Sequence, residues 1–238
     1  MLRFILLAIA TMFAVPLAAQ SLPPRGQTAI VPELVVENRA VPGGEADLAI
    51  LMRTTPGWHG YWLNPGDAGL PMTVKWTLPP GWSVGPMRYP VPGKLLVADI
   101  PNYVYEKDYA VLVRLKAPPG TTGSHRISAK MNWLACTDEI CVPEKGEVSL
   151  SVPTGGTALP DTRFNEWRRA LPQPLAATAK FALTAKTLRL AIPLPASAVI
   201  GTPYFFPVTD GPIDYAAPQV FKRQGDTLIV ELQRRRGA

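Results

Sequence analysis

Two cysteines, Cys136 and Cys141, are the residues of this sequence whose type and spacing could do redox chemistry. Four residues separate them, so they do not form the Cys-x-x-Cys motif of thioredoxin-like proteins. The histidines, His59 and His125, are distant in sequence, and four ligands for a zinc ion are not in evidence. A disulfide that closes so short a loop adds only about 2 kcal/mol of stability in the chain-entropy model. The spacing alone leaves two interpretations open, a structural clip of a hairpin and a disulfide that a partner thiol opens and closes.

The charges beside the cysteines are mainly negative. Asp138 and Glu139 lie between the two cysteines, and Glu144 follows them, next to Lys145. Nearby carboxylates disfavour a thiolate, so we expect the pKa of each thiol to lie at or above its usual value of about 8.5. Such a dithiol would react slowly with stray oxidants and would need a docked partner. The alternative is that these acidic side chains point into solvent and change the thiol pKa little.

Proline-rich turns and short apolar segments indicate the elements that must hold this pair. The chain has 27 prolines in 238 residues, about twice the usual share, which argues against a helical bundle. Hydrophobic residues at 47% and charged residues at 18% exclude a disordered chain. Met72–Leu78 alternates with a period of two, and Arg126–Trp133 is a further expected strand that ends just before Cys136. About seven short strands before residue 153 predict an antiparallel β-sandwich.

A change of composition at residues 153–157 predicts a linker, so we expect a first unit over residues 20–153 and a second over residues 154–238. Residues 161–171 form the best helix candidate. The apolar face of this helix carries Phe164, Trp167 and Leu171. Four later segments are predicted strands, namely Ala179–Leu183, Leu188–Ile192, Tyr204–Val208 and Thr227–Leu232. So short a region is small for an independent sandwich, so we expect this mainly β unit to be incomplete or to dock on the first.

The first 19 residues have the pattern of a secretory signal peptide. Arg3 precedes an apolar run from Phe4 to Val15, and small residues follow up to Ala19, where we expect cleavage. The run is shorter than the roughly 20 residues that a membrane-spanning helix needs. Charged residues or prolines interrupt every later apolar run, so we expect an exported, soluble mature chain without a transmembrane segment. The compartment that receives it would permit disulfides.

The net charge of +6 does not indicate a nucleic-acid-binding protein. Most of the excess lies after residue 157, including the C-terminal run Arg234–Arg236, which we interpret as a solvated end. No basic stripe with interleaved aromatic residues is present. An ordinary hydrolase is not supported either, because Gly-x-Ser-x-Gly, His-Glu-x-x-His and a phosphate-binding glycine loop are all missing from the sequence.

Four blocks of the sequence carry a resemblance to a known family. In chain order they are Trp58–Pro71 with Trp76–Gly81, Asn102–Glu106, Trp133–Cys136 with Ile140–Glu144, and Tyr204–Pro207 with Ile213–Pro218. They resemble the periplasmic N-terminal domain of the DsbD/ScsB thiol–disulfide reductases, and the ScsB branch in particular. The blocks cover most of the expected mature chain in the right order.

The resemblance implies an all-β, immunoglobulin-like antiparallel β-sandwich, followed by a smaller, mainly β unit with one short helix. It also implies that Cys136 and Cys141 form a reversible disulfide. In the family the second cysteine usually forms the mixed disulfide with the partner, so the resemblance gives this role to Cys141. Cys136 then becomes the resolving thiol, which the short loop holds close to the mixed disulfide.

Further residues are expected to shape the site. An aromatic cap loop shields the cysteines in family members, and its candidates here are Tyr103, Val104 and Tyr105. The alternative for these three residues is ordinary core packing. Trp58, His59, Tyr61 and Trp62 are expected on a loop near the same end of the sandwich, and Trp133 is a further residue expected to shape the site. For His59 we weigh a proton relay or the tuning of a thiol against a structural hydrogen bond.

The resemblance implies a relay of two electrons. The donor would be a membrane-embedded or thioredoxin-like protein, the acceptor a periplasmic thiol–disulfide protein, and no cofactor or bound metal is expected. Family members continue into a transmembrane conduit and usually a thioredoxin-like domain, whereas this sequence ends at Ala238. We therefore expect separate proteins to supply these modules, or the chain to be a fragment. Two alternatives stay open: a non-enzymatic exported β-sandwich that binds proteins and has a structural disulfide, and a protein that handles Cu(I) with the reduced pair.

Overall fold

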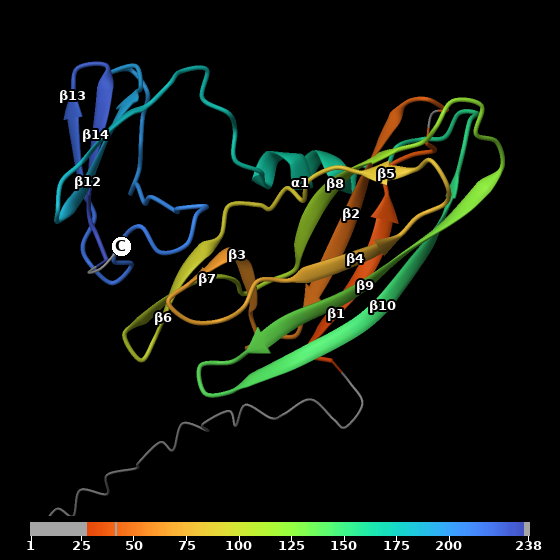
Figure 1. Ribbon diagram of the computed structural model, residues 1–238, viewed down its shortest axis with the longest axis horizontal. Coiled ribbons are helices and arrows are strands. Elements are labelled where there is room, and N and C mark those ends of the chain that lie inside the picture. Colours follow the sequence, from red (N-terminus) through yellow and green to blue (C-terminus); the bar gives the residue numbers. More distant parts are fainter. Residues whose placement is uncertain (1–27, 41, 236–238) are drawn as a thin grey trace, which may run out of the picture.

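The computed structural model describes residues 28–40 and 42–235, which form β-strands and one α-helix (Figure 1). The predicted all-β class is therefore confirmed. The signal peptide predicted at residues 1–19 lies outside the described residues. Among the residues that are described, no helix has the length and apolar character needed to cross a membrane.

The first part of the chain is a sandwich of two antiparallel sheets. One sheet has the order β1-β2-β8-β5, and the other has the order β10-β9-β4. The strands are β1 (Ile30–Val36), β2 (Glu45–Thr54), β4 (Thr73–Thr77), β5 (Ser83–Val84), β8 (Tyr109–Lys116), β9 (Ser124–Cys136) and β10 (Cys141–Pro153). The predicted strand at residues 72–78 is thus β4, which pairs with β9 and contributes an edge of the second sheet.

The β2 strand is buried on both faces, which explains its nearly continuous apolar sequence. Leu48, Ile50 and Met52 belong to the main hydrophobic core of the sandwich. Ala49 and Leu51, which alternate with them, belong to a second cluster on the outer face of the sheet. The first sheet is therefore covered by the second sheet on one side and needs another cover on the other side.

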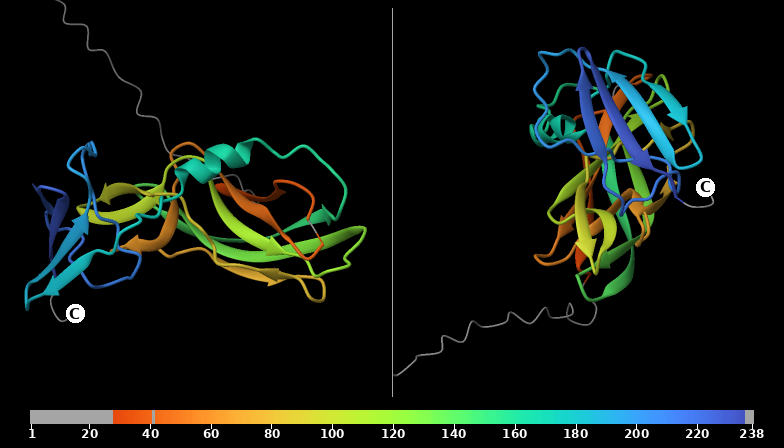
Figure 2. Two further views of the ribbon diagram at one scale, coloured as in Figure 1. Left: turned by 90° about the horizontal axis from the view of Figure 1, so that it is seen from above. Right: turned by 90° about the vertical axis from the view of Figure 1, so that its left-hand side faces the viewer.

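Helix α1 (Arg163–Ala170) supplies that cover (Figure 2). Phe164 is fully buried in the outer cluster, and Trp167 and Leu171 pack against the same cluster. The predicted apolar face of the helix is therefore confirmed. Thr162 makes no side-chain capping bond, and the Asp161 carboxylate instead accepts a hydrogen bond from the Arg163 backbone N–H at 3.0 Å.

A third, smaller sheet lies at one end of the sandwich, with the order β3-β7-β6. Its strands are β3 (Gly60–Gly66), β6 (Gly93–Val97) and β7 (Ile100–Tyr105). His59, directly before β3, forms an antiparallel bridge with Cys136 at the end of β9. This bridge ties the third sheet to the end of the hairpin that carries the cysteines.

The C-terminal part of the chain forms a fourth sheet, which lies beyond β3, β6 and β7 at the end of the elongated molecule (Figures 1 and 2). Its order is β11-β12-β14-β13, with β11 (Lys180–Leu183), β12 (Thr187–Pro193), β13 (Val220–Gln224) and β14 (Thr227–Gln233). The strand predicted at Tyr204–Val208 is wrong, because this segment pairs with no strand. The side-chain amide of Gln219 bonds the Phe205 backbone instead, accepting from its N–H at 2.7 Å and donating to its carbonyl at 3.0 Å.

Candidate functional site

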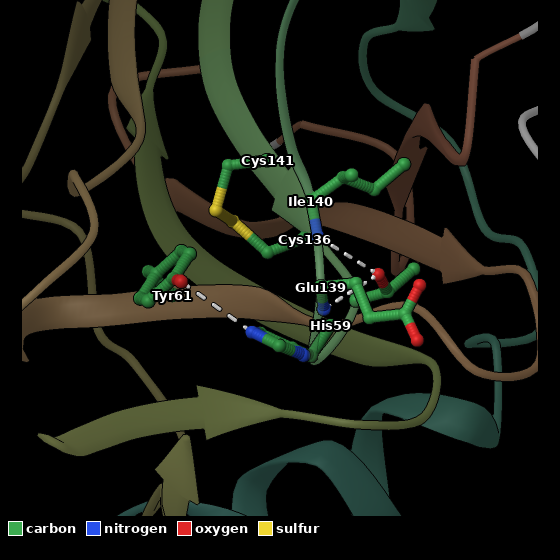
Figure 3. Close-up of a disulfide and its surroundings, with 7 residues drawn as sticks. His59, Tyr61, Cys136, Glu139, Ile140 and Cys141 are labelled. Atoms are coloured by element: carbon green, nitrogen blue, oxygen red, sulfur yellow. Dashed lines mark hydrogen bonds between the residues drawn. A yellow bond between two sulfur atoms is a disulfide. The ribbon is translucent and has the colours of Figure 1, made fainter. Parts of the chain in front are cut away.

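The two cysteines close the end of the longest hairpin in the described chain. Cys136 is the last residue of β9 and Cys141 is the first residue of β10, so they face each other in the antiparallel register. Their sulfur atoms form a disulfide with an S–S distance of 2.02 Å and a Cα–Cα distance of 4.1 Å (Figure 3). The pairing of β9 with β10 thus places the two cysteines at the end of the sandwich where the third sheet begins.

Thr137 organises the four-residue loop between the cysteines. Its backbone N–H donates to the Ile140 carbonyl at 2.8 Å. Its hydroxyl oxygen accepts from the backbone N–H groups of Glu139 and Ile140 at 3.1 and 3.2 Å (Figure 3). Sequence reasoning missed this residue, although a threonine at the start of a tight turn is a known signal for such a hydroxyl–backbone turn.

The two sulfur-bearing residues differ in exposure. Cys136 is 1% exposed and belongs to a small apolar cluster with Tyr61, Val104 and Leu134. Cys141 lies on the exposed side of the hairpin end. Cys141 is therefore the residue of the pair that lies open at the surface, and Cys136 is the one that the protein encloses.

A cavity of about 140 Å³ lies beside the disulfide. Its lining comes from the cysteine loop, from the start of β3 with the loop after it, and from the tip of the β6–β7 hairpin. The lining residues are His59, Tyr61, Ala68, Val97, Ile100, Asn102, Thr137, Asp138, Glu139, Ile140 and Cys141. Of the predicted site residues, the cavity brings His59, Tyr61 and Cys141 together.

His59 is held against the disulfide by the backbone. Its N–H donates to the Cys136 carbonyl at 2.8 Å, and its carbonyl accepts from the Cys136 N–H at 3.1 Å. Burial lowers the pKa of the imidazole below 6.5, and the carboxylates of Asp138 and Glu106 only partly oppose this shift. The ring is therefore neutral at pH 7, and its Nε2 lies 3.4 Å from the Tyr61 hydroxyl (Figure 3).

The Tyr61 ring packs edge-on against the His59 ring, and a glycine-containing loop covers Tyr61. Burial raises the pKa of the Tyr61 phenol, so the hydroxyl stays protonated at neutral pH. Gly69 has a φ of +91°, and a Cβ at this position would lie 2.1 Å from the Tyr61 ring. Only glycine allows so close an approach, so Gly69 lets the loop after β3 pack onto Tyr61.

The predicted aromatic cap lies in strand β7 rather than in a loop. Val104 belongs to the buried apolar cluster of Cys136. Tyr103 and Tyr105 point to the opposite face, because side chains alternate along a strand. Tyr103 packs against Trp62 and the C-terminal region, and Tyr105 stacks on Tyr109 with 4.1 Å between ring centroids.

The tip of the β6–β7 hairpin lies beside the cysteine loop. Val97 and Ile100 line the cavity beside the disulfide. Between them, Ala98 and Asp99 turn the chain with φ angles of 47° and 65°. Sequence reasoning missed this tip, because Ala-Asp lacks the glycine that usually marks a turn with positive φ angles.

Trp58 and Trp133 are buried and do not line the cavity beside the disulfide. Trp58 belongs to the main core. The Trp133 indole N–H donates to the Glu144 carboxylate at 2.7 Å, and the same carboxylate accepts the backbone N–H groups of Ala29 and Ile30 at 2.5 and 3.2 Å. These contacts fix the start of β1 to β10, so both tryptophans support the site from the core.

The described residues contain no cluster of three or more histidine, cysteine, aspartate or glutamate side chains that could hold a metal ion. His125 lies away from the cysteines, with its Nε2 2.9 Å from the Thr122 carbonyl and its ring against Trp82.

Comparisons with known proteins agree with this geometry. A family model described as the N-terminal part of thiol:disulfide interchange protein DsbD matches residues 27–153. The N-terminal periplasmic domain of ScsB from Proteus mirabilis has a TM-score of 0.59 and 20% identity, over 84% of this chain and 78% of that one. The reduced N-terminal domain of Neisseria meningitidis DsbD has a TM-score of 0.34 and 16% identity, over 59% and 95% of the two chains. No curated protein sequence matches.

The likeness to the ScsB domain concerns the fold. A coverage of 84% is more than residues 27–153 can supply, so the similarity extends into the C-terminal region. The predicted immunoglobulin-like, all-β architecture is confirmed.

Proposed function

This chain belongs to the family of N-terminal domains of thiol:disulfide interchange protein DsbD, and we propose that it relays two electrons between periplasmic partner proteins through Cys136 and Cys141. The family that the four sequence blocks indicated is confirmed, and the chain is a thiol–disulfide interchange domain. The direction of transfer, the roles of the individual cysteines and the partners are the substance of the proposal.

The observation that carries the proposal is the unequal exposure of the two cysteines. Cys141 is exposed at the end of the hairpin, and Cys136 is 1% exposed. A disulfide that only clips a hairpin has no need of one accessible sulfur beside a cavity. The accessible sulfur supports the role of Cys141 as the partner-binding cysteine, and the enclosed sulfur supports the role of Cys136 as the resolving one.

Reduction of the domain proceeds by two exchange steps. A thiolate of the donor attacks the Cys141 sulfur, the Cys136–Cys141 bond breaks, and Cys136 leaves as a thiolate that takes up a proton. The second thiol of the donor, as a thiolate, then attacks the donor sulfur of this mixed disulfide and releases Cys141. The donor becomes a disulfide, and the domain becomes a dithiol that holds the two electrons.

Delivery of the electrons follows the reverse path. The Cys141 thiolate attacks the disulfide of the acceptor, whose other sulfur leaves as a thiolate. Cys136 then attacks the Cys141 sulfur, so the intramolecular disulfide forms again and the acceptor leaves as a dithiol. The ladder of β9 and β10 keeps Cys136 close to the mixed disulfide, which favours this second step over dissociation by stray thiols.

The donor proposed here is a membrane-embedded or thioredoxin-like protein, and the acceptor is a periplasmic thiol–disulfide protein. The matched ScsB domain is described as periplasmic, which supports the same compartment for this chain. We also propose that residues 20–153 form the redox unit and that residues 154–238 form a second unit. The second unit contacts the first through α1, which covers the first sheet, and through β3, where the Asn64 amide donates to the Pro207 carbonyl at 2.7 Å and to the Tyr215 hydroxyl at 3.0 Å.

Cysteine variants test the proposal. In periplasmic extracts that contain the acceptor, Cys136→Ala should accumulate a mixed disulfide that reducing agent dissolves, and Cys141→Ala should not. A redox titration of the wild type should give a reduction potential above about −300 mV, the range below which structural disulfides lie. A potential far below this value, together with no trapped partner for Cys136→Ala, would instead establish a structural disulfide.

A further inference from the structure

The rim of the cavity beside the disulfide is acidic. Asp138 and Glu139, which lie between the cysteines, are exposed. They are the residues of the cavity lining that carry a charge, because His59 is neutral. Neither carboxylate has an ion-pair partner within residues 28–40 and 42–235. No lysine or arginine lines the cavity. Most of the chain's excess positive charge lies after residue 157, away from this negatively charged rim.

Two further carboxylates face the same end of the sandwich from other loops. Asp99 is exposed at the tip of the β6–β7 hairpin, between two residues that line the cavity. Glu106, directly after β7, is close enough to His59 to act on its charge. Among basic groups, Lys107 follows Glu106, and Lys145 lies four residues beyond Cys141, which is roughly 13 Å along a strand. Asp138 and Glu139 lie closer to Cys141 along the chain than this lysine.

Apolar side chains flank the exposed sulfur within this acidic rim. Ile140, directly before Cys141, is 37% exposed, and Ile100 at the hairpin tip is 44% exposed. A partner that reaches Cys141 must therefore contact apolar surface and come close to the carboxylates of Asp138 and Glu139. The attacking group is itself a thiolate, so the rim repels it unless the partner carries compensating charge.

We propose that this disulfide exchanges preferentially with thiols that carry a positive charge beside the attacking sulfur, so that its partner proteins have a lysine or arginine next to their reactive cysteine. The inference rests on the proposed function, because it names the class of thiol that the same site accepts. The exchange step is unchanged: the partner thiolate bonds to the Cys141 sulfur, the disulfide breaks, and Cys136 leaves as a thiolate that is then protonated.

Small thiols of different charge test the inference without a known partner. The probes are cysteamine, 2-mercaptoethanol and 3-mercaptopropionate, whose attacking forms are net neutral, singly negative and doubly negative. Each rate with the wild-type disulfide is divided by the rate with bis(2-hydroxyethyl) disulfide, a neutral reference that removes the intrinsic reactivity of the thiol. Measurements at about 10 mM and about 1 M salt compare screening lengths of about 30 and 3 Å.

The expected order of normalised rates at low salt is cysteamine, then 2-mercaptoethanol, then 3-mercaptopropionate. Each nearby carboxylate should change the rate by about two- to threefold per unit of charge, so the first and last probes should differ by about tenfold or more. The difference should collapse at high salt and in the double variant Asp138→Asn/Glu139→Gln. The matched control Glu147→Gln/Glu231→Gln removes the same charge from exposed positions on β10 and β14 and should behave as the wild type.

Three results would overturn a conclusion, and they are distinguishable. Equal normalised rates for all three probes at low salt would refute the charge preference and leave the relay function standing. A preference that persists in Asp138→Asn/Glu139→Gln would refute its assignment to these carboxylates. Exchange far slower than the reference for every probe, including cysteamine, at both salt concentrations would count against the relay function itself.

Discussion

The hydroxyl of Thr137 is expected to set part of the reduction potential. In the oxidised protein the disulfide holds the loop closed, so the change Thr137→Val imposes the full loss of the two hydrogen bonds to Glu139 and Ile140. In the reduced protein the loop is free to relax, and it escapes part of that loss. The oxidised state is therefore destabilised more than the reduced state, and the potential should rise.

The size of the rise follows from the two hydrogen bonds. Each contributes about 0.5–1.5 kcal/mol, and water replaces part of this because the loop is at the surface. A net difference of about 1 kcal/mol between the two states corresponds to a rise of about 20 mV for a two-electron couple. The sign is the firmer part of the prediction, because it depends only on which state can relax.

The assay is equilibration in dithiothreitol redox buffers, followed by alkylation and measurement of the mass shift. Thr121→Val is the matched control, because the Thr121 hydroxyl donates to the Pro118 carbonyl at 2.6 Å in a loop without cysteines. The control should leave the potential unchanged. A potential for Thr137→Val at or below that of the wild type, or an equal rise in the control, would refute the reasoning.

Three further outcomes are expected. Glu144→Gln should lower the free energy of unfolding by about 2–4 kcal/mol in urea, because an amide with one acceptor oxygen leaves a buried N–H unpaired; a loss below about 1 kcal/mol would contradict this. Gly69→Ala should cost about 1–3 kcal/mol, and clearly more than Gly57→Ala, a positive-φ position with open space around it; equal losses would show that the Tyr61 contact is unimportant. Because burial puts the folded-state pKa of His59 below its unfolded value of 6.5, the unfolded chain takes up the proton first as the pH falls. The stability that neutral His59 contributes is thus present above pH 6.5 and lost below it. When the pH is lowered from about 7.5 to about 5, His59→Gln should therefore lose less free energy of unfolding than the wild type. An equal loss in both proteins would argue against a lowered pKa of His59.

Local patterns predicted the parts of the fold that depend on neighbouring residues. The period of two at residues 72–78 identified β4, and the spacing of Phe164, Trp167 and Leu171 identified the buried face of α1. Both patterns report which side of an element is buried, and this information is contained in a few consecutive residues.

Which side chains line the cavity depends on the pairing of strands that are distant in sequence, and no local pattern specifies that pairing. The register of β7 against β3 places Val104 toward Cys136 and sends Tyr103 to the other face. A shift of one residue would exchange these two sides, and the sequence carries no local signal that fixes this register. The segment at Tyr204–Val208 has the composition of a strand, but the backbone N–H and carbonyl of Phe205 bond the side chain of Gln219 instead of a neighbouring strand.

Because side chains alternate along β3 and β7, each strand lines the redox cavity with one face and contacts the C-terminal region with the other. In β3, Tyr61 lines the cavity beside the disulfide, and Trp62 packs on Phe206 with 6.1 Å between ring centroids. In β7, Asn102 lines the same cavity, and Tyr103 contacts Tyr204 and Phe206. Residues that line the redox cavity, Tyr61 and Asn102, are therefore direct chain neighbours of residues that pack against Tyr204 and Phe206, so a change in that aromatic packing reaches the backbone of the cavity lining within one residue.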